Sequence, residues 1–465
     1  MAKRLLTLTL AVVLGVAFVA PAMAEVQNIK VSGDMIMRGI YRDNLDFVKD
    51  SGDETEAWIS TGVRVGVGVE FTDNVMAMVR VINERDWGKS VIQTAAGAGT
   101  VVGLPLDTSD DIKLDLAYAK INDLFIPGLN VTLGRQELLL GKGFVVGNVN
   151  SNLTAAANTA IRAWDLTSRK SFDAIKAEYE LGIAPLSFTV MGAKIIEESN
   201  NAVTALIPIP AGDSDLWGLN VAYQMDNAVI EGYLLNLKRQ AIPVLVTDKY
   251  DIWTLGARVD HDVAALPGFN YNLELGYQFG DGADVNGDGT SDDKKAWAGT
   301  ADVSYTFNNP YSPKIGAAYT YYSGPDFSAT VADDEGWDPI FPDGQAGRIG
   351  NVTNAVLSGT PAAFLAGIGN ATNLSVPKIY ASFKPGEKHA LSLDWYIDTQ
   401  STEVPAGTGD KLGWEVDLGY AYQLNSDVTM GLSIGYMEAD DDFVGTGAGV
   451  DDTAMEVIGS VSLAF

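Results

Sequence analysis

The chain has no cysteine among its 465 residues, so it can form neither a disulfide nor a thiolate metal or haem-attachment site. It has only two histidines, His261 and His389, and neither lies near a nucleophile motif of the kind that hydrolases use. A phosphate-binding loop and a dinucleotide fingerprint are also missing. We therefore expect that the protein is not an enzyme, and that the two histidines are polar residues at strand ends.

Long apolar runs are missing as well, apart from one at the N-terminus. No later stretch approaches the roughly 18 uninterrupted apolar residues of a membrane-spanning helix. If the protein crosses a membrane, it must therefore do so with β-strands.

Basic residues are scarce: 31 lysines and arginines face 60 aspartates and glutamates, which gives a net charge of −29. A protein that binds nucleic acid needs a basic surface for the phosphates, so we expect no nucleic-acid partner. The location of the few cations within the fold then matters more than their number.

The one long apolar run belongs to an export signal. Lys3 and Arg4 precede apolar residues 5–20, and the small-residue site Ala22-Met23-Ala24 follows directly. This order is typical of a secretory signal peptide. We expect residues 1–24 to be removed and residues 25–465 to form one domain.

The last thirteen residues alternate with a period of two, which is the period of a β-strand. One face of this stretch carries Met455, Val457, Gly459, Val461, Leu463 and Phe465. A strand of about ten residues with one apolar face is what crosses a bilayer in a closed barrel, although an edge strand of a soluble sandwich also alternates. Only repetition along the chain can separate the two readings.

The same alternation recurs from end to end and predicts eighteen strands, with sixteen as the alternative count. The predicted strands are 26–41, 57–71, 75–84, 111–121, 129–140, 170–181, 186–197, 214–226, 228–238, 250–261, 269–279, 295–307, 313–323, 374–384, 389–398, 411–424, 428–437 and 453–465. Eight short connections alternate strictly with nine long ones. This is the layout of an all-β, antiparallel transmembrane barrel with short periplasmic turns and long extracellular loops, in the outer membrane of a Gram-negative cell.

Aromatic residues gather near the predicted strand ends, as expected for girdles at the two membrane interfaces; examples are Tyr41, Phe71, Trp253, Phe279, Trp297 and Phe307. We expect lipid and lipopolysaccharide around the barrel. The final strand should pair with 26–41 to close the wall, and its terminal Phe465 resembles the signal that the barrel assembly machinery reads.

Strand parity directs a set of charged residues toward the lumen, where charge is expected, whereas arginine or lysine on the lipid face costs roughly 2–4 kcal/mol at the bilayer midplane. The predicted inward charges that we assign to the pore lining are Arg38, Arg64, Arg80, Lys176, Arg258, Glu70, Glu84, Asp115 and Glu178. The first three could form a positive strip that faces an acidic wall and selects charged solutes. Each of them could equally be a solvated wall residue.

The loop after Phe279 contains a D-x-N-x-D-G sequence, which places hard oxygen ligands around a turn as in a calcium loop. The candidate ligands are Asp284, Asn286, Asp288, Thr290 and Asp292. The twelfth position, normally a bidentate glutamate, is Lys295. A weak calcium site and a solvated acidic loop both remain open, and we expect no other cofactor.

Three short segments resemble the alginate-export family of outer-membrane channels: Gly134-Arg135-Gln136-Glu137-Leu138, Arg169-Lys170-Ser171-Phe172-Asp173-Ala174-Ile175 and Trp337-Asp338-Pro339-Ile340-Phe341-Pro342. The resemblance implies a passive channel with a basic constriction that folded loops partly gate. It also implies that Arg135 and Arg169 line the pore. The many acids in the external loops depart from what an exporter of an anionic polymer would carry.

The sequence therefore favours a porin for passive diffusion of small hydrophilic, charged solutes. Two alternatives stay open: a selective exporter of an anionic polysaccharide, and a structural or adhesive barrel whose lumen is closed by the 324–373 loop.

Overall fold

The structure is a computed structural model. It describes residues 26–45, 47, 55–88, 112–148, 163–196, 213–239, 250–285, 290–327, 333–343, 347–350, 372–404, 409–444 and 450–465. The predicted signal peptide lies outside these ranges and stays a prediction. Within them, no helix is both long and apolar enough to cross a membrane.

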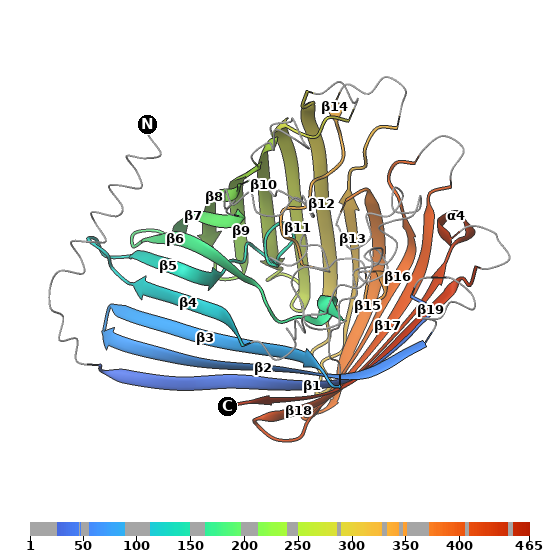
Figure 1. Cartoon of the computed structure of the whole chain (residues 1–465), viewed down its shortest axis with the longest axis horizontal. Coiled ribbons are helices and arrows are strands. Elements are labelled where there is room, and N and C mark those ends of the chain that lie inside the picture. The colour runs from blue at the N-terminus through green and yellow to red at the C-terminus, as the bar shows by residue number, and fades with distance from the viewer. Residues whose placement is uncertain are drawn as a thin grey trace, which may run out of the picture.

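Eighteen antiparallel strands form one closed wall, and the alternative count of sixteen is wrong (Figure 1). They are β1 (Asn28–Asp43), β2 (Thr55–Thr72), β3 (Val75–Asp86), β4 (Lys113–Ile121), β5 (Leu129–Glu137), β6 (Ser171–Leu181), β7 (Leu186–Ile196), β8 (Ser214–Gln224), β9 (Ala228–Arg239), β10 (Tyr250–Asp262), β11 (Phe269–Asp281), β12 (Asp293–Thr306), β13 (Lys314–Tyr322), β15 (Leu374–Gly386), β16 (His389–Gln400), β17 (Lys411–Gln423), β18 (Val428–Ala439) and β19 (Thr453–Ala464).

In the part of the chain that the structure describes, three short elements lie outside the wall. The two-residue strand β14 (Asp333–Asp334) pairs in parallel with β12. The 3-10 helix η2 (Trp164–Leu166) and the helix α4 (Asp441–Val444) belong to long connections.

The predicted pairing of the final strand with the first strand is confirmed. Met35 lies opposite Leu463 and Gly39 opposite Gly459 in the β1–β19 register. Gly33 and Phe465 close the seam with reciprocal backbone hydrogen bonds of 2.9 and 3.0 Å. Closure leaves no edge of unpaired N–H and C=O groups, which is the condition for a sheet to cross a membrane.

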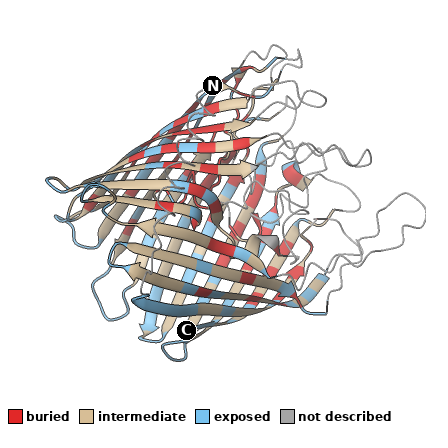
Figure 2. Ribbon diagram, turned by 60° about the vertical axis from the view of Figure 1, so that its left-hand side comes forward, coloured by how far each residue is buried: buried red, intermediate tan, exposed pale blue. Residues whose placement is uncertain are grey.

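The two faces of the wall differ, and buried and more exposed residues alternate along its strands (Figure 2). In β10, Ile252 is 1% exposed and Thr254 is fully buried, whereas the residues that alternate with them, Trp253 and Leu255, are 38% and 56% exposed. Exposed apolar residues continue around the outside, for example Val67, Val79, Trp217, Leu275, Trp297, Ile379 and Leu432. Such a band faces lipid, so the chain is a transmembrane β-barrel as predicted.

The hydrophobic core lies inside the barrel, because two connections fold inward. We call residues 138–148 and 333–343 the inner loops. Phe341 donates its N–H to Val145 O at 2.9 Å, and Gly147 donates to Phe341 O at 2.8 Å. Their apolar side chains bury the lumen side of the wall, including Leu216, Leu235, Ala296 and Tyr322. One side of the lumen is therefore filled by protein.

Candidate functional site: the loop-narrowed lumen

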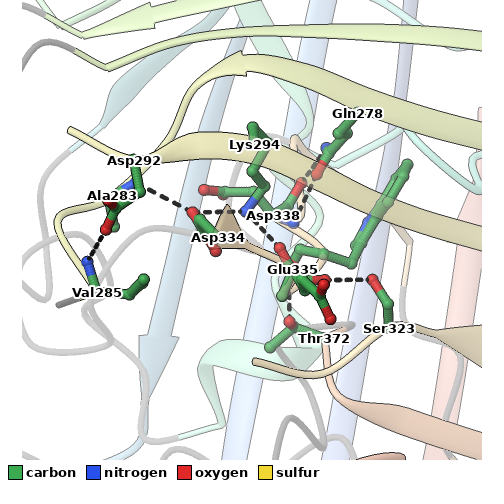
Figure 3. Close-up of polar contacts among 12 residues, drawn as sticks. Gln278, Ala283, Val285, Asp292, Lys294, Ser323, Asp334, Glu335, Asp338 and Thr372 are labelled. Atoms are coloured by element: carbon green, nitrogen blue, oxygen red, sulfur yellow. Dashed lines mark hydrogen bonds and ion pairs between the residues drawn. The ribbon is translucent and has the colours of Figure 1, made fainter. Parts of the chain in front are cut away.

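The second inner loop is held on β11 and β12 by a set of buried polar contacts (Figure 3). Nζ of Lys294 lies 2.9 Å from Oδ2 of Asp334, which also accepts the N–H of Ala283 at 3.0 Å. Gln278 exchanges two hydrogen bonds with the backbone of Asp338, at 2.7 and 2.8 Å. These side chains supply hydrogen-bond partners to polar groups of the loop that are withdrawn from water. They therefore fix the loop against the wall.

Segment 163–170 lies against the opposite side of the lumen, on β1, β3 and β19. Arg42 bonds both Asp165 and Glu456 at 2.7 Å, and its side chain is only 7% exposed. Glu84 accepts the hydroxyl of Thr167 at 2.7 Å and the N–H of Ser168 at 2.8 Å. The segment is thereby attached to the wall through charges that point inward.

Segment 347–350 docks on β17 through two buried carboxylates. Glu415 accepts the N–H groups of Ile349 and Gly350 at 2.7 and 2.9 Å. Asp417 accepts the N–H of Arg348 at 3.1 Å. Gly347 has a φ of +87°, and a Cβ there would lie 2.5 Å from Oε2 of Glu415, so only glycine fits this approach.

A cavity of about 300 Å³ remains between segments 163–170 and 347–350. Its lining residues are Asp165, Leu166, Gly347, Arg348, Ser392, Asp394, Tyr396, Asp417, Leu418, Gly419 and Glu456. They come from two connections and from β16, β17 and β19, so the cavity lies where the lumen is narrowed by loops.

Most of the cations predicted to line the pore are paired with carboxylates. Arg64 lies 2.9 Å from Asp34, and Arg80 contacts Asp115 at 2.5 Å and Glu137 at 2.6 Å. Lys176 lies 3.0 Å from Glu178, and Lys30 lies 3.1 Å from Glu70. Arg258 is buried and bonds Glu231, Asp260 and Asn272. This pairing reduces the positive field expected of the strip, and the lining role of these residues stays a prediction.

Arg38 shares the inward face of β1 with Arg42 and is partly buried. Arg169 lies 3.8 Å from Glu84 at the end of segment 163–170, and the pore-lining role that the family resemblance implies for it stays a prediction.

Arg135 occupies a different face. The register sets it opposite Asp173, with which it forms bonds of 2.8 and 2.6 Å. Asp173 alternates with the buried Phe172 and Ala174 and shares its face of β6 with the exposed Ile175. A lumen role for Arg135 therefore has no support from its position and stays a prediction.

Sequence reasoning missed Arg42, Asp165, Arg348 and Glu456. Arg42 follows the inward parity of β1, so parity could have found it had the first strand been extended past residue 41. Glu456 lies inside the predicted strand 453–465, on the face opposite the apolar one, and parity alone directs it inward. Asp165 and Arg348 lie in long connections, where no periodicity indicates direction.

The candidate calcium loop is only partly described, because Asn286 and Asp288 lie outside the described residues. Gly282 donates its N–H to Asp292 O at 2.8 Å, and Asp292 Oδ2 accepts the N–H of Val285 at 2.8 Å. Lys295 pairs with Asp333 at 2.7 Å. Calcium binding stays a prediction.

Each histidine lies at a strand end, against a tyrosine. His261 Nδ1 is 3.1 Å from the hydroxyl of Tyr271, and His389 Nδ1 is 2.8 Å from that of Tyr420. These contacts suit the expected structural role.

The three segments that resemble the alginate-export family meet in space. Arg135 of the first bonds Asp173 of the second, and the Phe172 and Phe341 rings of the second and third pack edge to face, with centroids 5.3 Å apart. Residues 218–398 match the alginate-export family. The match contains the third segment of this alginate-export-like barrel and lies outside the first two. No curated protein matches the sequence.

Solved structures share the fold. Pseudomonas aeruginosa OccK8 (OprE) is 12% identical, with a TM-score of 0.57, and the alignment covers 95% of this chain and 99% of that one. Acinetobacter baumannii OccAB4 is 11% identical with a TM-score of 0.55 and the same coverage of both chains. Pseudomonas aeruginosa OpdQ is 12% identical with a TM-score of 0.55, covering 95% and 98%. The closed eighteen-stranded wall, its apolar exterior and the family match place the alginate-export-like barrel in the Gram-negative outer membrane.

Proposed function

We propose that the protein is an outer-membrane porin through which small hydrophilic, charged solutes diffuse. The observation that carries this proposal is the polar cavity between segments 163–170 and 347–350, lined by charged groups inside a closed transmembrane wall. Selectivity in pores of this kind comes from the size of the constriction and the charges that line it. The proposed function involves no catalysis.

Single-channel recording in a planar bilayer tests this function. Purified barrels should give stepwise, ohmic conductance at constant voltage. A folded barrel that inserts without conducting would favour the closed structural or adhesive barrel, since the inner loops already fill one side of the lumen.

Export of an anionic polysaccharide is the second candidate, because the family match describes alginate export. That function predicts anion-selective current that uronate oligomers block and that Arg169→Ala weakens. Cation selectivity without block would exclude it. The acidic lining of the cavity favours the porin.

Several accompanying roles belong to the same proposal. Lipopolysaccharide would surround the outer wall, and the assembly machinery would read the strand that ends in the exposed Phe465. Residues 1–24 would direct export. Calcium, if it binds, would tie together the loop at 284–292 and take no part in transport.

A further inference from the structure

The cavity between segments 163–170 and 347–350 contains carboxylate oxygens that the protein leaves without partners. Asp417 is 6% exposed, and within the described part of the chain its Oδ1 has no hydrogen-bond partner. Oδ1 of Asp165 is likewise withdrawn from solvent and without a partner there. The two residues come from different elements, a long connection and β17, and both line the same cavity. Leaving buried charged acceptors unsatisfied is costly, so such atoms indicate a missing positive group.

The charges around the cavity do not balance. Four carboxylates line it, Asp165, Asp394, Asp417 and Glu456, against three cations that line it or bond its lining, Arg42, Arg348 and Lys378. Arg42 is shared between Asp165 and Glu456, and Lys378 reaches Asp394 only at 3.5 Å. An excess of negative charge therefore remains beside Asp417, whose immediate neighbour on the inward face of β17 is Glu415.

An aromatic ring of the cavity already faces a cation. Nζ of Lys378 lies 5.5 Å from the ring centroid of Tyr396, which lines the cavity together with Ser392. Rings and carboxylates together form a favourable environment for ammonium and guanidinium groups. A volume of about 300 Å³ is at the small end of ligand pockets and suits a compact solute.

We propose that this cavity is a binding subsite for a small organic cation, an alkylammonium or guanidinium ion, which passes between segments 163–170 and 347–350. Asp417 and Asp394 contact the cation and Tyr396 packs against it, while Arg348 opposes it and limits how tightly it is held. The subsite rests on the proposed porin function, since it lies on the route that a diffusing solute would take. It makes cations the preferred cargo.

The test uses ethylguanidinium as the probe and propionate as an anion of similar size. Their dissociation constants are measured twice: as block of single-channel current in dilute potassium chloride, and by calorimetry on the folded protein in detergent. Ethylguanidinium should bind and propionate should not. Asp417→Asn and Asp394→Asn should each weaken ethylguanidinium binding at least about tenfold, the size expected for loss of one charged partner.

Two further variants separate a binding role from general damage. Arg348→Gln removes the opposing cation and should tighten ethylguanidinium binding. Asp260→Asn alters an inward carboxylate of β10 that accepts a hydrogen bond from Asn270 at 3.0 Å and does not line the cavity, so it should leave binding unchanged. Equal affinity for the probe in wild type, Asp417→Asn and Arg348→Gln would overturn the proposal, as would preferential binding of propionate.

The two measurements also distinguish this inference from the porin itself. If the barrel conducts but binds no ethylguanidinium, the porin function stands and the proposed subsite is wrong. If the barrel does not conduct, yet calorimetry shows ethylguanidinium binding that depends on Asp417 as predicted, the subsite stands and the porin function is wrong.

Discussion

Arg42 forms ion pairs with two carboxylates that are largely withdrawn from water, Asp165 and Glu456. Arg42→Gln should destabilise the barrel by about 3 kcal/mol, since removal of one member of a buried ionic group leaves the others uncompensated. Urea unfolding of the barrel in detergent, followed by circular dichroism, measures the loss. Arg64→Gln is the matched control: its pair with Asp34 is partly exposed, and the loss should be about 1 kcal/mol or less. Equal losses in the two variants would contradict the buried triad.

Asp338 should make docking of the second inner loop depend on pH. Desolvation raises the pKa of its carboxyl to about 6 in the docked loop, only partly offset by the positive charge of Arg239. The docked loop therefore binds a proton more tightly than the free loop, so docking is strongest below about pH 4 and weakens as pH rises to about 6. Loop-opening events in single-channel records should be more frequent at pH 7 than at pH 4.5. Asp338→Asn should remove this difference, and an unchanged pH profile in that variant would refute the assignment.

Parity along each strand is a property of the sequence, and from it we predicted that Arg64 and Arg258 point inward. In the structure these residues pair with Asp34 and Glu231 of neighbouring strands. Parity could not find Asp165 or Arg348, because a connection carries no period from which direction can be read. Nor could it show that most of the predicted basic strip is neutralised by carboxylates from neighbouring strands.

At the scale of elements, the inner loops determine the width of the lumen. Trp337 is 2% exposed and occupies space over Gly276, where a Cβ would lie 2.9 Å from its ring. Trp337→Ala should weaken the free energy of loop docking by about 3 kcal/mol or more, because a buried indole is lost. The variant should also have a higher single-channel conductance. Trp217→Ala removes an indole that is 53% exposed on the outer wall and should leave conductance unchanged. Equal conductance in wild type and Trp337→Ala would mean that this loop does not narrow the path.

The seam between β1 and β19 depends on the absence of a side chain at Gly33. A Cβ at this position would lie 2.5 Å from Arg64 O and 2.6 Å from the Phe465 ring. Gly33→Ala should therefore lower the yield of heat-modifiable, folded barrel in a refolding assay. Gly39→Ala on the same strand meets no atom within 4 Å and provides the control. Equal folding yields would show that the seam tolerates the methyl group.

The strands were predictable because one wall face must meet lipid over the whole membrane thickness, which imposes the period of two on every strand. The strands of the structure match the predicted ones to within a few residues, from β1 to β19. The inner loops were not predictable in this way. Their packing depends on contacts such as Phe172 with Phe341, between residues far apart in the sequence.

For the whole molecule, 60 acidic residues against 31 basic ones give a net charge of −29. This composition predicts that nucleic acid is not a partner, but it does not predict whether the lumen prefers cations or anions. The structure narrows the question, because the cavity at the loop constriction has more carboxylates than cations. We therefore expect cations to carry most of the current.

Reversal potential across a potassium chloride gradient, recorded from single wild-type channels, tests whether the lumen conducts and prefers cations. We expect stepwise conductance whose reversal potential has the sign of cation selectivity. We also expect Asp417→Asn to move the potential toward zero. Folded barrels that insert but carry no current, or that pass chloride in preference to potassium, would contradict these expectations.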